Sequence, residues 1–345
     1  MRRKMREPHT LFVLLCGGVG SRLWPLSGVD RPKQTIPFID GKTLLDYTLD
    51  RVFFAAAKND EVGVVTTQRQ FDIMPVPSTN KFDFCVCEPA SRDTAAAIAL
   101  SCLRMKKYGD PVVAFIPIDH FIPDTDAFKK AIDVAVKSAL ESDNIILLGI
   151  KPDRPETGYG YINIPEVSSG DDIFKVKKFL EKPGIEEAKT LFVRDDVLWN
   201  SGMFIGRLSV FLREIQLHTP KVWSGVVEFS DARREYNSIP KKSFDREVLE
   251  KSETISVLRC NFEWSDVGTL DRFVDFANRY SDGSQKKIIS DQRGNIAHVP
   301  GDEVIFLGVD NICVVRANGV LVILNRSKSE MVKDLARQPL GAVHL

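Results

Sequence analysis

The sequence has no excess of charge of either sign. Its 47 lysine and arginine residues are balanced by 47 aspartate and glutamate residues in a chain of 345. Without a global field, we expect no binding of nucleic acid or of a membrane surface through net charge. Any basic site must therefore be local.

Long apolar runs are also missing. The basic residues 1–10 are followed by only six apolar residues, 11–16, which is too short for the core of a signal peptide. No stretch is long enough to span a bilayer. We therefore expect a cytoplasmic protein.

Cysteine is sparse and irregularly spaced. The six cysteines contain no C-x-x-C pair, so neither a zinc site nor a disulfide framework is expected. Cys85 and Cys87 lie two residues apart in an apolar run and would share one face of a strand. We expect both to be reduced, buried packing residues.

Glycine, in contrast, is concentrated at one point. Residues 11–16 form a short apolar run typical of a strand buried in a parallel sheet, and three glycines follow almost at once. Without Cβ atoms, this loop can adopt positive φ and bring several backbone N–H groups against one anion. The candidate donors are Gly17, Gly18, Gly20, Ser21, Arg22 and Lys33. We interpret the loop as a phosphate cradle.

Two common phosphate-binding motifs do not occur. The fingerprint G-x-G-x-x-G needs a third glycine where Leu23 stands, and no acidic residue ends a second strand about 20 residues on. The string G-x-x-x-x-G-K-[ST] is missing as well. A plain glycine-rich turn is the alternative, and the positive charges of Arg22 and Lys33 favour phosphate binding over it.

The sequence around this loop resembles a known signature. Gly-Gly-Val-Gly-Ser-Arg-Leu-Trp-Pro-Leu-Ser at 17–27, followed by Arg-Pro-Lys-Gln at 31–34, resembles sugar-1-phosphate nucleotidyltransferases. The Trp-Pro-Leu-Ser and Pro-Lys-Gln details are similar to the mannose-1-phosphate guanylyltransferase branch. The resemblance implies a Rossmann-like fold in which the loop and Arg22 bind the leaving phosphates. It also implies that Lys33 stabilises charge on the α-phosphate.

A second motif is similar to the family's nucleoside-binding segment. Residues 88–95 resemble Glu-Pro-x-x-Arg-Asn-Thr-Ala, which implies that guanine and ribose are bound by Glu88, Arg92, Asp93 and Thr94. Asp93 replaces the family's asparagine, and a carboxylate can accept from guanine but cannot donate. From the residues alone, Asp93 or Thr94 can equally cap the following helix.

Two aspartates are candidate metal ligands. Asp119 follows a buried strand, and ligands of open parallel sheets bind at that edge. The family's Pro-Ala-Asp-His motif resembles residues 117–120, and its Trp-x-Asp-x-Gly motif resembles 264–268. The resemblance implies that Asp119 and Asp266 bind Mg²⁺, which prefers carboxylate oxygens. By residue type alone, Asp119 can be a turn residue and Asp266 can form an Asx-turn.

Three further strings, at 157–161, 179–183 and 199–204, resemble the family's sugar-side motifs. The sugar 1-phosphate is then implied to be bound by Tyr159, Gly160, Glu181, Lys182 and Asn200, with Lys182 counted as catalytic because it neutralises the phosphate. Each string is weak alone, since glycines also form hairpin turns and a Glu–Lys pair is often simply solvated.

Strand and helix patterns alternate along most of the chain. Thr43 and Asp46 have capping-box spacing before a helix with apolar residues at helical period, which are Leu45, Leu49, Val52, Phe53 and Ala56. Residues 61–66, 111–120 and 144–149 are typical of strands, and 125–139 of an amphipathic helix. The alternation predicts a doubly wound, mostly parallel α/β sheet.

From about residue 285 the composition changes to short β-rich segments. Asn318-Gly319 predicts a hairpin, and Ser327 with Glu330 predicts the cap of a last short helix. We expect a nucleotidyltransferase catalytic domain over residues 1–284 and a small β-rich domain over 285–345. The small domain has no catalytic signature and is assigned to packing or to self-association as a homodimer.

The resemblance implies one reaction: transfer of GMP from GTP to α-D-mannose 1-phosphate, giving GDP-mannose and pyrophosphate with Mg²⁺. The sugar phosphate would attack the α-phosphorus in line, without a covalent nucleophile.

Two alternatives stay open. The same core can serve another nucleotide or sugar, such as GDP-heptose or a UDP- or dTDP-hexose, or the chain can be a regulatory paralogue that binds nucleotide sugar. A regulatory chain is expected to have lost Arg22, Lys33, Asp119 or Asp266, and all four are present.

Overall fold

The computed structural model describes residues 9–18, 20–28, 30–165, 172–232, 234–281, 288–290 and 293–336. Packing divides the chain into two compact units. The first comprises residues 1–17, 49–118 and 122–264, and the second comprises residues 18–48, 119–121 and 265–345. Each unit has its own apolar core. The expected domain boundary at 284/285 lies outside the described residues and stays a prediction.

Strands and helices alternate along the first unit, and short strands follow near the C-terminal end. The strands are β1 (Thr10–Leu15), β2 (Pro37–Ile39), β3 (Lys42–Thr43), β4 (Glu61–Thr67), β5 (Phe84–Glu88), β6 (Val112–Pro117), β7 (Ile145–Ile150), β8 (Gly160–Asn163), β9 (Ile173–Lys175), β10 (Lys178–Glu181), β11 (Val197–Arg207), β12 (Ile255–Cys260), β13 (Ile288–Ser290), β14 (Ile296–His298), β15 (Val304–Phe306), β16 (Ile312–Ala317) and β17 (Val320–Asn325). The α-helices are α1 (Leu44–Ala55), α2 (Gln68–Asp72), α3 (Val76–Thr79), α4 (Asp93–Met105), α5 (Thr125–Glu141), α6 (Ile185–Phe192), α7 (Leu208–His218), α8 (Pro220–Ser230), α9 (Leu270–Tyr280) and α10 (Val332–Leu335).

Shorter helical turns connect these elements. The 3-10 helices are η1 (Ser21–Leu23), η2 (Lys33–Thr35), η3 (Lys106–Tyr108), η4 (Tyr236–Ser238) and η6 (Arg326–Met331), and η5 (Asp245–Leu249) is a π-helix.

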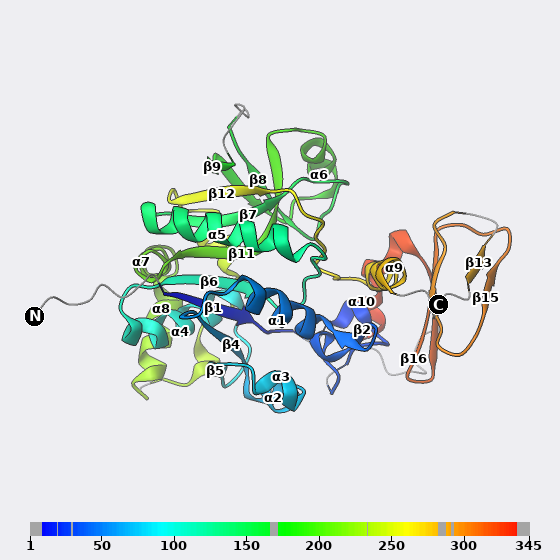
Figure 1. The fold of residues 1–345 in the computed structure, drawn as a ribbon, viewed down its shortest axis with the longest axis horizontal. Helices are drawn as coiled ribbons and strands as arrows, with labels where there is room; N and C mark the ends of the chain where they lie inside the picture. Colours follow the sequence, from blue (N-terminus) through cyan, green and yellow to red (C-terminus); the bar gives the residue numbers. More distant parts are fainter. Residues whose placement is uncertain are drawn as a thin grey trace, which may run out of the picture. The chain divides into compact units, whose positions relative to one another are not determined.

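Among the described residues of the first unit, ten strands form one mixed sheet (Figure 1). Its order is β5-β4-β1-β6-β11-β7-β12-β9, and β8 pairs with both β10 and β11. Strands β5, β4, β1 and β6 are parallel, as are β7 and β12, whereas β11 is antiparallel to both β6 and β7. Helices α4, α7 and α8 share an apolar cluster with the sheet, and α5 packs on β7 and β11. The expected doubly wound, mostly parallel fold is confirmed.

Helix α1 begins where the sequence predicts, but one residue of its predicted apolar face is exposed. The Asp46 N–H donates to Thr43 Oγ1 at 3.1 Å, and the Thr43 N–H donates to Asp46 Oδ2 at 3.0 Å, which completes the capping box. Phe53, however, is 40% exposed. The buried stripe runs through Leu45, Val52 and Ala55, and because successive helical residues are rotated by about 100°, Phe53 falls outside it.

The C-terminal segment of the second unit contains the predicted hairpin. Asn318 and Gly319 both have positive φ, 50° and 77°, and join β16 to β17, as a two-residue hairpin turn requires. Ser327 is not the cap of the following helix. Instead, Asn325 Oδ1 accepts from the Ser327 N–H at 3.1 Å, and the helix begins one residue earlier than the predicted cap.

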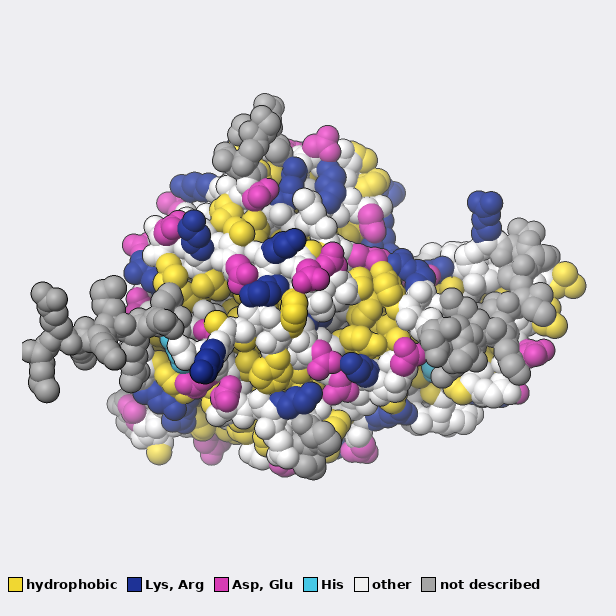
Figure 2. Space-filling model, viewed as in Figure 1, with side chains coloured by type: hydrophobic (Ala, Val, Ile, Leu, Met, Phe, Trp, Pro, Cys, Tyr) yellow, Lys and Arg dark blue, Asp and Glu magenta, His cyan; other side chains and the backbone are white. Residues whose placement is uncertain are grey.

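The surface and helices agree with the mixed composition. On the face shown in Figure 2, basic and acidic side chains are interspersed. No helix in the part of the chain that the structure describes combines the length and apolar character needed to cross a membrane.

The prediction that Cys85 and Cys87 are buried is wrong. They do share one face of β5, but it is the exposed face, and their Sγ atoms lie 3.2 Å apart. Val86 and Glu88 take the buried positions between and after them. Because β5 is the edge strand of the sheet, an apolar run there does not require cover on both faces.

Thiol labelling tests this arrangement. In native protein, a maleimide is expected to modify Cys85 and Cys87 first, because Cys16, Cys102, Cys260 and Cys313 are buried. Peptide mass spectrometry after short labelling times measures the order of modification. The paired Cys85→Ser and Cys87→Ser variant should lose the fast phase, and fast labelling of any buried cysteine would contradict the structure.

Candidate active site

A buried lysine connects the two candidate metal ligands in the second unit. Lys33 Nζ donates to Asp119 Oδ2 at 3.1 Å and also to the backbone carbonyl of Asp266. The Lys33 side chain is almost fully buried, whereas that of Asp119 is about one-third exposed. A buried ammonium must be paired, so Lys33 fixes Asp119 and the Asp266 turn relative to each other.

Gly20 allows the glycine loop to pack directly on this lysine. Its φ is +69°, and a Cβ at this position would lie 2.6 Å from Cβ of Lys33. The Gly20 carbonyl accepts from Ser27 Oγ at 2.5 Å and from the Leu23 N–H at 2.8 Å. The loop therefore needs glycine here for both its conformation and its contact.

The other residues of the predicted phosphate loop follow β1 and extend into η1. Gly17 follows β1, Gly18 has a φ of +82°, and Ser21 and Arg22 begin η1. The Arg22 guanidinium donates through Nη1 to Glu330 Oε1 at 2.8 Å, an interaction with the C-terminal segment. The structure thus places Gly18, Gly20, Ser21, Arg22, Lys33, Asp119 and Asp266 in the second unit, whereas Gly17 belongs to the first.

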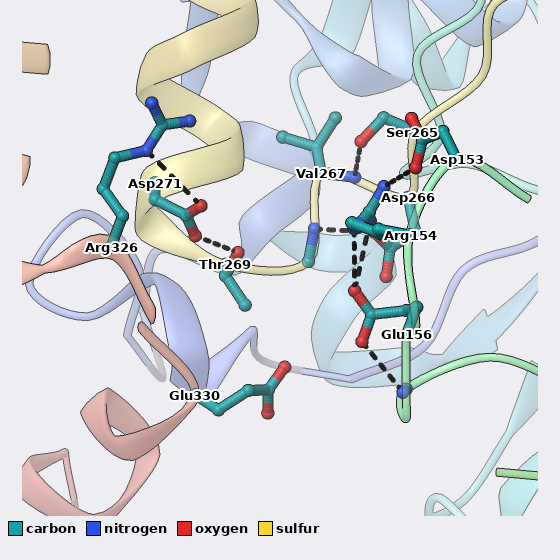
Figure 3. A network of polar contacts seen from close by, with 12 residues as sticks. Asp153, Arg154, Glu156, Ser265, Asp266, Val267, Thr269, Asp271, Arg326 and Glu330 are labelled. Carbon is teal, nitrogen blue, oxygen red and sulfur yellow. Dashed lines mark hydrogen bonds and ion pairs between the residues drawn. The ribbon is translucent and has the colours of Figure 1, made fainter. Parts of the chain in front are cut away.

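A short backbone pairing aligns the segments that carry the two aspartates. The Phe121 N–H donates to the Ser265 carbonyl at 2.8 Å, and the Ser265 N–H donates back at 3.1 Å. Asp119 and Asp266 lie two residues before and one residue after this bridge. Figure 3 shows Ser265, Asp266 and Val267 on the turn that leads into α9.

The turn at Asp266 is strained. Its carboxylate accepts from the Gly268 N–H at 3.1 Å, so the Asx-type turn is present. A Cβ on Gly268 would lie 2.5 Å from Asp266 Oδ2. The next residue, Val267, has a φ of +44° and is fully buried. Positive φ at a β-branched residue costs energy, and residues strained in this way cluster at functional sites.

The predicted nucleoside-binding residues are assembled in the first unit at the end of β5. Glu88 is buried and accepts from Tyr236 Oη at 2.5 Å. Arg92 Nε donates to the Ile239 carbonyl at 2.7 Å, and Thr94 Oγ1 accepts from the Phe244 N–H at 2.8 Å. Thr94 therefore does not cap its own helix. Asp93 has a φ of +69° and accepts from the Thr94 N–H at 2.8 Å.

Burial changes the acidity of this group. It raises the pKa of Glu88 to about 7, the Asp93 charge adds to the increase, and the hydrogen bond from Tyr236 opposes it. Burial and the Glu88 charge also raise the pKa of the Tyr236 phenol. Tyr236 therefore stays protonated, donates a hydrogen bond to Glu88 and orients the carboxyl group.

The predicted sugar-side residues also come together in the first unit. Gly160 pairs with Glu181 across β8 and β10, and a Cβ on Gly160 would lie 2.8 Å from Glu181 Oε2 and 3.3 Å from Asn200 Cβ. Tyr159 packs edge-on against Trp199 and Trp264, with ring centroids 5.1 and 4.9 Å away. Gly160 is the position that lets these side chains converge.

The Glu181-Lys182 pair is not simply solvated. Glu181 is buried, Lys182 Nζ lies 2.5 Å from Glu181 Oε1, and Lys182 has a φ of +53°. The Glu181 N–H donates to Glu250 Oε1 at 2.7 Å. This contact holds the backbone that carries Lys182.

Asp245 is a member of the sugar-side group that no sequence motif indicates. Asn200 Nδ2 donates to Asp245 Oδ1 at 2.8 Å. Burial raises the pKa of Asp245, and burial together with the Asp245 charge raises that of Glu181. Because Phe244 contacts Thr94 and Asp245 contacts Asn200, residues 236–245 link the nucleoside-side and sugar-side groups.

Comparison with known proteins identifies the class. The family model for nucleotidyl transferases matches residues 11–283, which include every predicted site residue. This chain belongs to the nucleotidyl transferase family.

Named relatives give a more specific comparison than the family model. The mannose-1-phosphate guanylyltransferase of Escherichia coli K12 is 31% identical over 97% of this chain and 74% of its own length. Alginate biosynthesis protein AlgA of Pseudomonas syringae pv. tomato is 31% identical over 94% and 70%. A solved structure from Thermus thermophilus, described as a mannose-1-phosphate geranyltransferase, has a TM-score of 0.81 and 26% identity, covering 96% of this chain and 99% of its own.

The nucleotidyl transferase family generally uses a divalent metal ion. Within the described ranges, no group of three or more His, Cys, Asp or Glu side chains is arranged to hold a metal. A hard cation that also binds substrate phosphates needs only one or two protein carboxylates. Asp119 and Asp266, both held by Lys33, supply that donor set, so the residues present fit a divalent ion.

The pKa of Glu88 predicts a pH-dependent stability. Between its ordinary value of 4.5 and about 7, the folded chain retains a proton that the unfolded chain has lost. The contribution of Glu88 to the free energy of unfolding is therefore fully present below pH 4.5 and is lost as the pH rises through 7. Relative to Glu88→Gln, the wild type should lose up to about 3 kcal/mol over this range.

Urea denaturation of both proteins at a series of pH values measures this difference. Tyr236→Phe serves as a second variant, because removal of the hydrogen bond that lowers the Glu88 pKa should move the transition to higher pH. A wild-type minus Glu88→Gln difference that does not depend on pH would refute the assignment.

Proposed function

We propose that this protein transfers GMP from GTP to α-D-mannose 1-phosphate and releases pyrophosphate. The proposal is supported by the relatives at about 31% identity over nearly the whole chain, which include named mannose-1-phosphate guanylyltransferases from Escherichia coli and Salmonella typhimurium. The observation that carries it is the buried Lys33 ammonium, bonded to Asp119 and to the Asp266 backbone beside a glycine loop.

The chemistry requires two anions to meet. An oxygen of the sugar phosphate forms a bond to the α-phosphorus of GTP as the bond to pyrophosphate breaks. No side chain needs to bond covalently, because positioning and charge stabilisation supply the rate. We assign the loop from Gly17 to Ser21, with Arg22, to the leaving phosphates, and Lys33 to the charge on the α-phosphate.

Specificity is assigned to the first unit. Glu88, Arg92, Asp93 and Thr94 would bind guanine and ribose, and Tyr236 would orient Glu88. The sugar hydroxyls would be bound by Tyr159, Gly160, Glu181 and Asn200, and Lys182 would pair with the sugar phosphate. Both groups contain buried, hydrogen-bonded polar side chains, which supports these roles. A ligand without the matching donor would leave a buried acceptor of the site unpaired, so such a site discriminates strongly against it.

Asp119 and Asp266 are proposed to hold Mg²⁺. When bound, this ion would supply positive charge against the phosphate oxygens of the nucleotide. Lys33 meanwhile keeps the Asp119 carboxylate and the Asp266 turn together, and the Asp266 to Gly268 hydrogen bond orients the second carboxylate.

A substrate matrix tests the reaction. Pyrophosphate release is measured with GTP, ATP, UTP, CTP and dTTP against the 1-phosphates of mannose, glucose, N-acetylglucosamine and a heptose, with Mg²⁺. GTP with mannose 1-phosphate should dominate. Asp119→Ala and Asp266→Ala should each lower kcat by on the order of 10²–10³, by analogy with loss of one charge-stabilising group.

Asp310→Ala is the matched control, because Asp310 is exposed in the second unit. It should leave the rate unchanged. Dominance of another nucleotide or sugar would overturn the substrate assignment but not the metal assignment. Full activity of Asp119→Ala or Asp266→Ala would overturn the metal assignment. If the folded wild type releases no pyrophosphate with any pair, the assignment as an enzyme is overturned.

Gly160→Ala tests the sugar-side group alone. The added methyl would meet Glu181, Phe179 and Asn200, and overpacking of this kind costs about 1–3 kcal/mol. We expect the KM for mannose 1-phosphate to rise by about tenfold or more and the KM for GTP to stay within about twofold. Gly184→Ala is the control, since a Cβ there meets nothing within 4 Å. An unchanged KM for the sugar phosphate would rule out this role.

A further inference from the structure

The 3-10 helix η6 contacts the phosphate loop through a charged pair. Arg22 Nη1 donates to Glu330 Oε1 at 2.8 Å, and the two side chains are 37% and 49% exposed. The sequence predicts that Glu330 closes a capping box with Ser327. Asn325 caps this segment instead, and the Glu330 carboxylate accepts from Arg22.

The same segment is also bonded to the start of α9. Ser329 Oγ is buried and accepts from the Asp271 N–H at 3.2 Å. Arg326 Nη2 lies 3.3 Å from Asp275 Oδ1, and its Nε lies 3.9 Å from Asp271 Oδ2. Figure 3 shows Arg326 beside Asp271, with Glu330 on the neighbouring part of the chain. Helix α9 begins four residues after Asp266. Residues 326–330 are therefore bonded both to the phosphate loop and to the helix that follows the Asp266 turn.

Two further contacts show that the attachment is not a single surface ion pair. Leu23, the residue after Arg22, is fully buried in the same apolar cluster as Val332 and Val322. The hairpin turn contributes as well, because Asn318 Nδ2 donates to the Pro25 carbonyl at 2.7 Å. The C-terminal segment is therefore packed against the η1 turn, which places Glu330 beside Arg22.

We propose that residues 326–330 form a C-terminal brace in which Glu330 is a positioning residue that orients Arg22 toward the nucleotide triphosphate. The proposal rests on the proposed function. Arginine loses considerable rotamer freedom when it is ordered, and a carboxylate that holds one Nη in advance removes part of that cost from nucleotide binding. A guanidinium has five N–H donors in a fixed fork, so a bond to one carboxylate oxygen does not use up its capacity for phosphate.

A competing role of Glu330 would change the nucleotide affinity in the opposite direction. If Glu330 competed with the triphosphate for Arg22, its removal would tighten nucleotide binding. If it positions Arg22, its removal weakens binding, and only while Arg22 is present. A double-mutant cycle separates these cases, because it isolates the pairwise interaction.

The cycle compares wild type, Glu330→Gln, Arg22→Ala and the double variant by calorimetric GTP binding and by kcat and KM. Glu330→Gln should weaken GTP binding by about fivefold in the wild-type background and by less than twofold with Arg22→Ala. The KM for mannose 1-phosphate should not change. Arg22→Lys replaces Arg22→Ala if the latter does not fold.

Asp334→Asn is the matched control. It removes the same charge four residues further on, from an exposed side chain, and should leave GTP binding unchanged. Equal weakening of GTP binding by Glu330→Gln in both backgrounds, or tighter binding, would overturn the brace. If the wild type binds GTP but does not transfer GMP, only the proposed function is overturned. The GTP affinities of the four variants still test the brace in that case. A chain that binds no nucleoside triphosphate would overturn both.

Discussion

The buried ammonium of Lys33 is the interaction on which the arrangement of the second unit depends. A buried charge is stable only when it is paired and hydrogen-bonded, and Lys33 obtains both from Asp119 and from the Asp266 carbonyl. Gly20 must lack a Cβ because the loop packs on the Lys33 stem. One side chain thus places three segments that are far apart in the sequence, and loss of it would leave the Asp119 carboxylate without its lysine counterion.

The parts of the fold that follow local rules could be predicted from the sequence. The apolar run before Gly17 forms a parallel strand, Thr43 and Asp46 form a capping box, and Asn318-Gly319 forms a hairpin. Each depends on residues within a few positions of one another, where periodicity, capping and turn chemistry act. The motif resemblance also named side chains that the structure gathers into groups, such as Gly160, Glu181 and Asn200. Their chemical roles stay predictions.

What could not be predicted depends on pairing between distant segments. The exposure of Cys85 and Cys87 requires knowing that β5 is an edge strand. Tyr236 and Asp245 join the candidate site only because residues 236–245 lie against Glu88, Thr94 and Asn200, more than 40 positions away in each case. The local pattern predicts that Glu330 caps a helix, whereas its partner is Arg22, 308 positions earlier. No local pattern carries such information.

Glu88, Glu181 and Asp245 are three buried acids whose pKa values are raised by burial. A carboxyl group in such a place destabilises the fold unless it is protonated or supplied with donors. Tyr236 donates to Glu88, Lys182 donates to Glu181, and Asn200 and Ser243 donate to Asp245. A carboxylate can accept more hydrogen bonds than these. Guanine N–H groups and sugar hydroxyls are donors of the kind that would use the remaining acceptor capacity. Under the proposed function, these ligand donors would offset the unfavourable burial of the acids, since a ligand that binds the folded state alone adds to its stability.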